Sequence, residues 1–486
     1  MVKWNTFAAV CDEIPGSPEV GVGFREAAVD SRAVQEGDLF VPLKGERTDG
    51  HLFIEQALEN GAAGVIVQAD FYNSHFELQK YFRKAAGKAV GIVPDTLKAL
   101  QQMARKAMLE HGRELVRIGV TGSNGKTTTK ELIGAVLSTD GAVFINKGNL
   151  NSEIGLCQEA LRLKGTERYA VFEMGMNRKG EMDILADIVR PDYAVITNIG
   201  TAHIGLIGSV EGIAAEKKKI FSRFTGSESG FIHEDEPFFH FLADGIRGRV
   251  FPYGKRSLGN RIIEQDRGLS GSEILFPEGT IRFPLIGSFN RKNMYAAYVL
   301  GRQLGISFSG IRTALESVEP LFGRGQIIEG EVTVILDCYN ANYDSMREAL
   351  TLFGGIPWEG RKTAVLGDMA ELGDFTDEMH TDLGRFAASI GADRICFFGP
   401  RMAAAYEAAM QVPAQDRKDS AGEEKYVFTE DIDILIREMK SSVSPGDLLL
   451  LKGSRSIELE RVLQHLPTGE NAGGNNAGPH KEKTLC

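Results

Sequence analysis

The sequence predicts an α/β protein of three domains, and three observations support this prediction. The chain has 486 residues, and a length of about 150 residues per domain suggests three domains. Short apolar runs alternate with segments of helical periodicity, which is typical of parallel sheets covered by helices. A glycine-containing loop at residues 121–129 separates one such run from an amphipathic helix, an order typical of a phosphate-binding loop.

The order of the elements divides the chain. We expect a small N-terminal α/β domain (1–111), a central P-loop nucleotide-binding domain with a parallel sheet (112–304), a C-terminal Rossmann-like α/β domain (305–466) and a disordered tail (467–486). The division rests on predicted strands at 38–43, 64–67, 115–120, 142–145, 169–172, 193–196, 332–336, 362–366 and 448–451. A helix at 97–110 should connect the first two domains, and residues 225–230 should form an exposed loop.

The loop after the strand at 115–120 predicts the nucleotide site. Its members are Gly122, Ser123, Asn124, Gly125, Lys126, Thr127 and Thr128. Backbone N–H groups of such a loop, together with the positive end of the following helix, bind phosphate oxygens. Lys126 should reach the terminal phosphates of ATP, and the hydroxyl of Thr127 should be a ligand of Mg²⁺. The loop is shorter than the pattern G-x-x-x-x-G-K-[ST], because Val120 stands where the first glycine would be.

Charge and composition argue against several classes of function. The chain carries 66 acidic and 55 basic residues, a net charge of −11, which argues against binding to nucleic acid or to anionic membranes. No segment approaches the length of a membrane span, and residues 1–20 lack the apolar core of a signal peptide. We therefore expect a cytoplasmic monomer without membrane insertion.

Two side chains that follow predicted strands are candidate metal ligands. Glu173 ends the strand at 169–172, and His203 follows the strand at 193–196. Both strands belong to the same predicted sheet, so both side chains should lie near the phosphate loop. Lys217 lies in a run of three lysines, whose default interpretation is a solvated face.

Several motifs in one order resemble those of the Mur ligase family. They are D-S-R at 30–32, K-G-x-x-x-D-G-H at 44–51, T-G-x-x-G-K-T-T at 121–128, G-N-x-N-x-x-I-G at 148–155, A-x-x-K-x-x-I-F at 214–221, N-x-x-N at 290–293, D-x-Y-N-A-N-x-x-S-M at 337–346 and L-G-D-M-x-E-L-G at 366–373. The resemblance covers the chain to about residue 466. Three positions depart from the family pattern: Ser152 stands where asparagine is frequent, Phe289 replaces a histidine, and Tyr343 replaces proline or a small residue.

The resemblance implies a role for each candidate residue. It implies catalytic roles for Lys126, His203, Lys217 and Arg324, and metal binding by Thr127, Glu173, His203 and Lys217. It adds Asn290, Asn293, Arg324 and Asp337 to the ATP site, and it implies that Ser31, Arg32, Asn149, Asn151 and Ser152 bind the UDP-linked substrate. In this family the lysine at the position of Lys217 is modified to a carbamate, and such an anion could help to hold a second Mg²⁺.

The resemblance also implies a reaction. The motifs at 337–346 and 366–373 are similar to those of family members that add D-alanyl-D-alanine to UDP-N-acetylmuramoyl-tripeptide with ATP and Mg²⁺. The expected steps are formation of an acyl phosphate on the tripeptide and its displacement by the amine, for the synthesis of peptidoglycan precursors. Two alternatives stay open: a folylpolyglutamate synthase-like ligase, and a P-loop nucleotide switch. Residues 146–149, Asn-Lys-Gly-Asn, lack the aspartate of a guanine-binding N-K-x-D motif.

Overall fold

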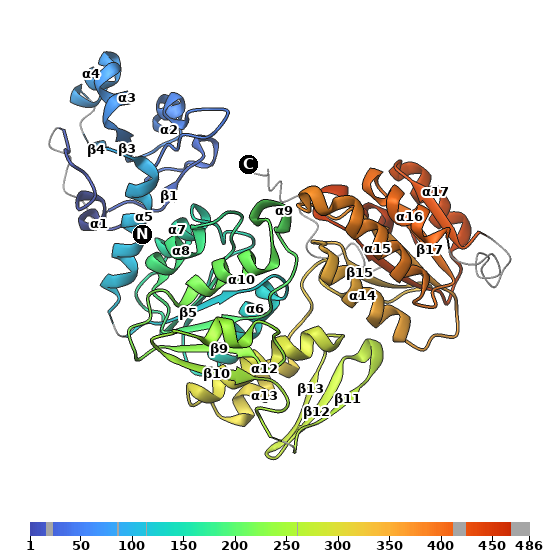
Figure 1. Ribbon diagram of the computed structural model, residues 1–486. Helices are drawn as coiled ribbons and strands as arrows, with labels where there is room; N and C mark the ends of the chain where they lie inside the picture. Colours follow the sequence, from blue (N-terminus) through green and yellow to red (C-terminus); the bar gives the residue numbers. More distant parts are fainter. Residues whose placement is uncertain (16–22, 85–86, 113, 260, 412–423, 468–486) are drawn as a thin grey trace.

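The computed structural model describes residues 1–15, 23–84, 87–112, 114–259, 261–411 and 424–467. These residues form four β-sheets with helices packed against them (Figure 1). Two of the sheets are wholly parallel and a third is parallel except at one edge, so the predicted α/β class is confirmed. The predicted disordered tail lies outside the described residues from position 468 onward. None of the described helices combines the length and the apolar character needed to span a bilayer.

The N-terminal sheet is small. Its strands stand in the order β1 (Ala27–Ala28), β2 (Leu39–Phe40), β3 (Gly64–Gln68) and β4 (Ala89–Val93). β2 is shorter than the predicted strand at 38–43, because Pro42 has no N–H with which to continue the ladder. The helices of this unit are α1 (Trp4–Ala8), α2 (Ile54–Glu59), α3 (Ala69–Ser74) and α4 (Phe76–Lys84), and α5 (Thr96–Glu110) leads to the central sheet.

The central sheet has six parallel strands in the order β10-β9-β8-β5-β7-β6. Their bounds are β5 (Val116–Thr121), β6 (Val143–Ile145), β7 (Tyr169–Glu173), β8 (Tyr193–Ile196), β9 (Ser229–His233) and β10 (Arg249–Tyr253). The helices are α6 (Lys126–Ser138), α7 (Gly155–Ala160), α8 (Glu181–Val189), α9 (Ile204–Ile207), α10 (Val210–Lys218), α11 (Phe239–Ala243), α12 (Ser288–Gln303) and α13 (Phe308–Glu316). β5 pairs with β7 and β8, so the loops that follow these three strands meet at one edge of the sheet.

The residues from 225 to the start of α12 form strands that the sequence does not predict. The predicted exposed loop at 225–230 is wrong for Ser229 and Gly230, which are buried at the start of β9. A Cβ at Gly230 would lie 2.8 Å from the ring of Phe221, so the glycine is needed for packing. The segment also contains a separate antiparallel sheet made of β11 (Ile263–Asp266), β12 (Ser272–Phe276) and β13 (Gly279–Phe283).

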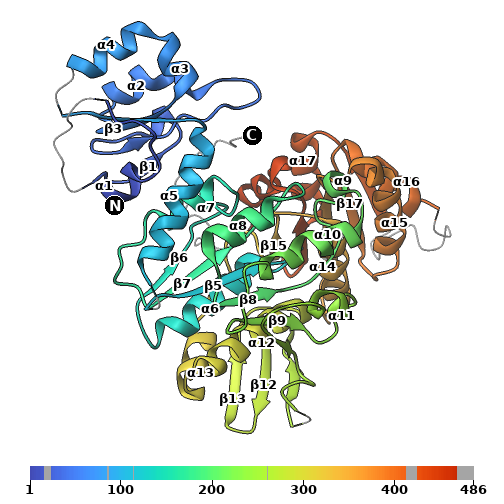
Figure 2. The ribbon, with the colours of Figure 1, turned by 60° about the vertical axis from the view of Figure 1, so that its left-hand side comes forward.

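The C-terminal sheet has six strands in the order β14-β15-β19-β16-β17-β18, and only β14 is antiparallel to its neighbour. The strands are β14 (Gln326–Ile328), β15 (Thr333–Asp337), β16 (Lys362–Gly367), β17 (Arg394–Phe398), β18 (Tyr426–Thr429) and β19 (Leu448–Lys452). The helices are α14 (Tyr343–Gly355), α15 (Thr376–Ala388), α16 (Ala403–Ala409) and α17 (Ile432–Ser442). Figures 1 and 2 show the N-terminal and C-terminal units on different sides of the central one, with α9 and α14 at the border between the last two.

Candidate active site

The phosphate loop joins β5 to α6, as the sequence predicts, and its shape is fixed by the loop after β8. Gly122 (φ 153°) and Gly125 (φ 75°) adopt backbone conformations that other residues rarely adopt, and a side chain at Gly122 would collide with the hydroxyl of Thr197. The backbone N–H of Asn124 donates to Oδ1 of Asn198 (2.9 Å), and the carbonyl of Asn124 accepts from the Thr197 hydroxyl (2.6 Å). The loop is therefore preformed at the N-terminus of α6, where backbone N–H groups can bind phosphate.

Two lysine ammonium groups converge on the loop. Nζ of Lys126 and Nζ of Lys217 both donate to the carbonyl oxygen of Gly122, each at 2.9 Å. Burial lowers the pKa of Lys126, although Glu173 and Glu371 oppose this effect. Lys217 is fully buried, and its pKa is lowered well below the ordinary value, first by burial and then by the charge of Lys126. The predicted solvated face is therefore wrong for Lys217.

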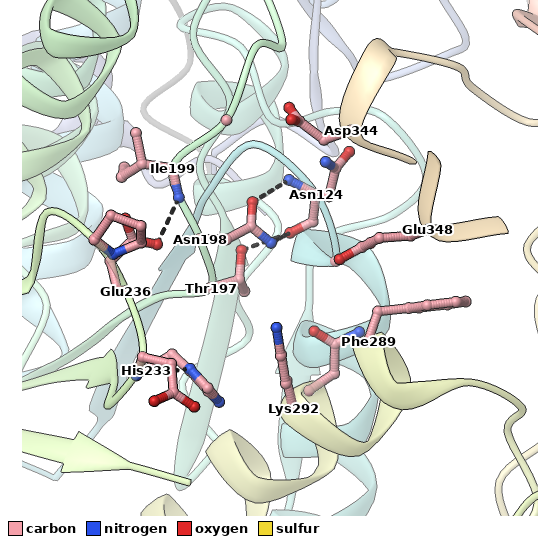
Figure 3. A pocket seen from close by; sticks show the side chains of 15 residues that line it. Asn124, Thr197, Asn198, Ile199, His233, Glu236, Phe289, Lys292, Asp344 and Glu348 are labelled. Atoms are coloured by element: carbon pink, nitrogen blue, oxygen red, sulfur yellow. Dashed lines mark hydrogen bonds between the residues drawn. The ribbon is translucent and has the colours of Figure 1, made fainter. Parts of the chain in front are cut away.

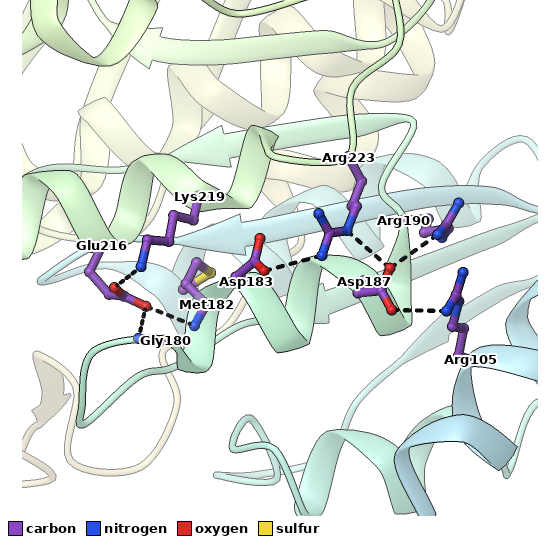
Figure 4. Close-up of polar contacts among 9 residues, drawn as sticks. All are labelled: Arg105, Gly180, Met182, Asp183, Asp187, Arg190, Glu216, Lys219 and Arg223. Atoms are coloured by element: carbon purple, nitrogen blue, oxygen red, sulfur yellow. Dashed lines mark hydrogen bonds and ion pairs between the residues drawn. The ribbon is translucent and has the colours of Figure 1, made fainter. Parts of the chain in front are cut away.

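The neighbour of Lys217 in sequence anchors α10. Glu216 is buried and accepts the backbone N–H groups of Gly180 (2.8 Å) and Met182 (3.1 Å) at the start of α8 (Figure 4). Its other oxygen lies 2.6 Å from Nζ of Lys219. These contacts tie α10 to α8 and so fix the helix that carries Lys217 to the phosphate loop.

Glu173, at the end of β7, is held by two side chains. The hydroxyl of Thr127 donates to one carboxylate oxygen and the amide of Asn151 donates to the other, both at 2.7 Å. Asn151, which the sequence predicts for the UDP-linked substrate, donates its amide to Glu173 in the structure. Thr127 and Glu173 together present oxygen atoms beside the phosphate loop, and Mg²⁺ prefers oxygen ligands.

His203 precedes α9 and faces the C-terminal unit. Its Nδ1 lies 2.7 Å from Oε2 of Glu371, a contact that is a salt bridge only when the imidazole is protonated. This pairing holds the pKa of Glu371 below its usual value. Across the described ranges, no three His, Cys, Asp or Glu side chains gather closely enough to hold a metal ion. The predicted metal set therefore needs the Thr127 hydroxyl, a modified Lys217 or phosphate oxygens to be complete.

A cleft of about 220 Å³ opens beside the loop, between the central and C-terminal units. Figure 3 labels the lining residues Asn124, Thr197, Asn198, Ile199, His233, Glu236, Phe289, Lys292, Asp344 and Glu348, with Lys292 and Glu348 reaching toward the cleft from α12 and α14. Burial raises the pKa values of Glu236 and Glu348. Asn293 also lines the cleft, as predicted for the ATP site. Asn290 does not, because it donates to the carbonyl of Ile286 and accepts from Asn293.

The C-terminal unit contributes directly to this site. The guanidinium of Arg324 lies 4.0 Å from the ring centroid of Tyr339, and its charge lowers the pKa of Lys126, which places it near the phosphate loop. Asp337, predicted for the ATP site, pairs with the buried Lys452 (3.0 Å) and does not line the cleft.

Two polar contacts join the start of α14 to the central unit. Oδ1 of Asn342 accepts the N–H of Ser345 and caps α14, while Nδ2 of Asn342 donates to Oδ1 of Asn124 at 2.7 Å. The carboxylate of Asp344 accepts both the backbone N–H (2.6 Å) and the hydroxyl (2.8 Å) of Thr201. The C-terminal unit is therefore docked on the phosphate loop.

The residues predicted for the UDP-linked substrate lie in two places. Ser31 donates to Gln56 (2.7 Å) and Arg32 pairs with Asp30 (2.5 Å), both in the N-terminal unit. Asn149 and Ser152 are exposed in the loop between β6 and α7. The N-terminal and central units meet at α7, where Gln158 donates to the carbonyl of Ala27 (3.0 Å).

Sequence reasoning misses several residues of the site, among them Lys292, Glu371, His233 and Glu348. Lys292 and Glu371 lie inside quoted motifs, so the motifs themselves could have pointed to them. His233 ends β9, a strand that the sequence does not predict, and Glu348 reaches the cleft only through the docking of α14.

The fold and the loop define a P-loop nucleotide-binding protein of the α/β class, and comparison with known proteins identifies its family. The chain matches the Mur ligase family, catalytic domain over residues 26–107, the Mur ligase middle domain over 120–301, and the Mur ligase, glutamate ligase domain over 323–455. A protein of Treponema pallidum named UDP-N-acetylmuramoyl-tripeptide–D-alanyl-D-alanine ligase is 40% identical over 465 residues, which are 94% of this chain and 98% of that protein. A Bacillus subtilis protein of the same name is 36% identical, over 90% of this chain and 92% of that protein. This chain belongs to the Mur ligase family.

Solved structures agree with this assignment. A crystal structure of MurF from Acinetobacter baumannii has a TM-score of 0.80 at 29% identity and covers 95% of this chain and 98% of that one. MurF from Thermotoga maritima in complex with ADP has a TM-score of 0.75 at 28% identity, with 91% and 96% covered. The predicted three-domain fold is therefore confirmed. FolC from Escherichia coli in complex with ADP, at 19% identity and a TM-score of 0.56, shares the fold alone.

Proposed function

We propose that this chain is an ATP-dependent ligase that joins D-alanyl-D-alanine to UDP-N-acetylmuramoyl-tripeptide in the synthesis of peptidoglycan precursors. The observation that carries this function is the 40% identity to the ligase of Treponema pallidum, which extends over almost the full length of both chains. The phosphate loop, and the docking of the C-terminal unit on it, are what a ligase that uses ATP requires. The third residue of the peptide is left to experiment.

The phosphate loop would bind the phosphates of ATP, and the cleft beside it would bind the nucleoside. Lys126 and Arg324 would offset the repulsion between the γ-phosphate and the carboxylate of the tripeptide. A carboxylate oxygen then attacks the γ-phosphorus, the bond from phosphorus to the bridging oxygen breaks, and ADP leaves. The amine of D-alanyl-D-alanine next attacks the acyl carbon, the bond to phosphate breaks, and the amine loses a proton.

The residues present fit a Mg²⁺ site next to the phosphates. Thr127 and Glu173 offer oxygen ligands 2.7 Å apart, and His203 could add its second ring nitrogen, Nε2, because its Nδ1 faces Glu371. Mg²⁺ commonly takes only one or two carboxylates and fills its other positions with phosphate oxygens and water. When bound, it would neutralise charge on the transferring phosphate.

Carbamoylation of Lys217 belongs to the same proposal. Burial and the charge of Lys126 both lower the pKa of Lys217, and the neutral amine is the form that reacts with CO₂. The resulting carbamate would replace a second ammonium group beside Lys126 with a negative charge, which could help to hold Mg²⁺. Mass spectrometry of the native protein in bicarbonate should find this adduct, and its absence together with full activity would reject it.

The N-terminal unit would hold the UDP end of the substrate. Ser31 and Arg32 would contact the uridine diphosphate, while Asn149 and Ser152 would contact the sugar or the peptide. Arg32→Ala should therefore raise the KM for the UDP-linked substrate and leave the KM for ATP unchanged. We further propose a cytoplasmic monomer, which light scattering of the purified chain would test.

The function is tested by phosphate release from ATP with the two building blocks supplied separately and together. Release should require UDP-N-acetylmuramoyl-tripeptide and D-alanyl-D-alanine together, and the UDP-linked pentapeptide should appear by mass spectrometry. Tripeptides with different third residues would define that specificity. Release with a folate and glutamate instead would favour a folylpolyglutamate synthase, and release without any amino-acid substrate would favour a nucleotide switch.

A further inference from the structure

The contact between α9 of the central unit and the 3-10 helix η5 (Gly373–Phe375) of the C-terminal unit has unusual backbone geometry. In the described parts of the chain, only four residues other than glycine have positive φ, and two of them are His203 (65°) and Glu371 (62°). These two residues make the contact between Nδ1 of His203 and Oε2 of Glu371 described above. Such conformations are strained and persist where the surrounding structure imposes them, often at functional sites.

Backbone contacts hold the two units together at this point. The N–H of Gly205 donates to the carbonyl of Glu371 at 3.1 Å. A Cβ at Gly205 would lie 2.6 Å from the carbonyl carbon of Leu372, and a Cβ at Gly373 would lie 2.8 Å from Cα of Gly205. Only glycine allows so close an approach of two backbones, so both positions are built for docking. Leu372 is almost fully buried and adds an apolar anchor.

The carboxylate of Glu371 is not needed for this docking. The docking uses the carbonyl of Glu371, the two glycines and the side chain of Leu372, whereas the Glu371 side chain is 49% exposed. It lies against His203, whose side chain is only 17% exposed, and its charge reaches Lys126 in the phosphate loop. The docked backbone thus brings a carboxylate of the C-terminal unit to an imidazole beside the phosphate loop.

We propose that Glu371 is a positioning residue: closure of the C-terminal unit sets its carboxylate against His203 and thereby orients the imidazole for its role in the metal site. A histidine that binds a metal through one ring nitrogen usually has its other nitrogen oriented by a carboxylate or a carbonyl. In this chain that partner comes from another unit of the fold. Orientation of His203 therefore depends on closure, and the open form lacks it. This inference rests on the proposed function.

The test uses three variants of the full chain. Glu371→Gln keeps the shape and the backbone contacts but removes the charge, and Gly205→Ala blocks the docking without changing a functional group. Asp374→Asn is the matched control, because Asp374 is an exposed carboxylate in the same 3-10 helix. Closure is measured by small-angle scattering with and without a non-hydrolysable ATP analogue. Mn²⁺ binding in the presence of that analogue is measured by paramagnetic resonance, and kcat and KM are measured by phosphate release.

Glu371→Gln should close like the wild-type protein but bind Mn²⁺ about 10- to 100-fold more weakly, with kcat lowered by a similar factor. Gly205→Ala should not become more compact with the ATP analogue, and it should lose both Mn²⁺ binding and phosphate release. Asp374→Asn should match the wild type in closure, Mn²⁺ binding and kcat. The inference is overturned if Glu371→Gln binds Mn²⁺ as the wild type does, or if it no longer closes, since its carboxylate would then serve docking alone. An inactive wild-type protein would instead reject the proposed function, whereas the scattering and Mn²⁺ results would still judge the role of Glu371.

Discussion

Lys217 should lower the stability of the protein while serving its activity, and Lys217→Met tests this directly. The ammonium is fully buried, with one hydrogen bond to the carbonyl of Gly122, which Lys126 also contacts. Losing a hydrogen bond from a charged group costs about 1.5–3 kcal/mol, but removing a buried charge gains several kcal/mol when, as for Lys217 among the described residues, only the more distant charge of Glu216 opposes its desolvation. Methionine has a similar volume and no charge, so we expect a net stabilisation of about 1–3 kcal/mol.

The assay is thermal unfolding in buffer free of bicarbonate, together with phosphate release. The Tm of the variant should rise by about 2–12 °C, since each kcal/mol shifts the Tm of a domain of this size by about 2–4 °C. Phosphate release should be lost in the same variant. A Tm below that of the wild type would refute the reasoning, because it would show that the ammonium of Lys217 stabilises the loop.

The effect should also depend on pH. The pKa of Lys217 in the folded protein is lowered below the ordinary value of 10.5. At a pH between the lowered pKa of the folded protein and the ordinary pKa of the unfolded chain, Lys217 is protonated only in the unfolded chain. The stability of the wild type therefore rises with pH in this range. The stability of Lys217→Met cannot rise with pH in this way, because methionine does not titrate. The difference in Tm between variant and wild type should therefore be largest near neutral pH and should narrow as the pH approaches 10.

Four further perturbations have expected outcomes. Lys126→Ala should reduce phosphate release by about 100-fold or more with an unchanged circular dichroism spectrum. Gly122→Ala should abolish binding of a fluorescent ATP analogue, because its Cβ would collide with Thr197. Asp187→Ala removes the shared partner of Arg105, Arg190 and Arg223 (Figure 4); it should lower the free energy of unfolding by about 1–2 kcal/mol and speed proteolysis at α5. Chelation of divalent cations should stop phosphate release, and added Mg²⁺ should restore it.

The parts of the site that could be predicted are those encoded by neighbouring residues. The strand, loop and helix around Lys126 follow one another in sequence, so their pattern alone reveals the phosphate loop. Family motifs correctly identify the Mur ligase family and the fold class. The sequence does not predict which distant partner a side chain meets: Asn151 contacts Glu173 and Asp337 contacts Lys452, and neither partner is visible in the local pattern.

The strands β9 and β10 were hidden for a related reason. β9 begins with Ser229 and Gly230, which are poor strand formers, and it is stabilised by pairing with β8 and by packing on Phe221. Tertiary contacts decide its structure, and they leave little trace in composition. No local sequence pattern therefore predicts that His233 lines the cleft.

The side chain of Asn342 makes two contacts, one through its oxygen and one through its nitrogen, and together they limit which residues can replace it. Its oxygen caps α14 and its nitrogen reaches Asn124 in the phosphate loop. Aspartate or serine would preserve the cap and lose the amide donor, while glutamine would keep both groups but add a methylene that shifts them. The start of α14 and the phosphate loop are thus coupled through the side-chain amide of Asn342. A substitution that preserves the helix cap disturbs the contact with the loop, and a substitution that preserves the contact disturbs the cap.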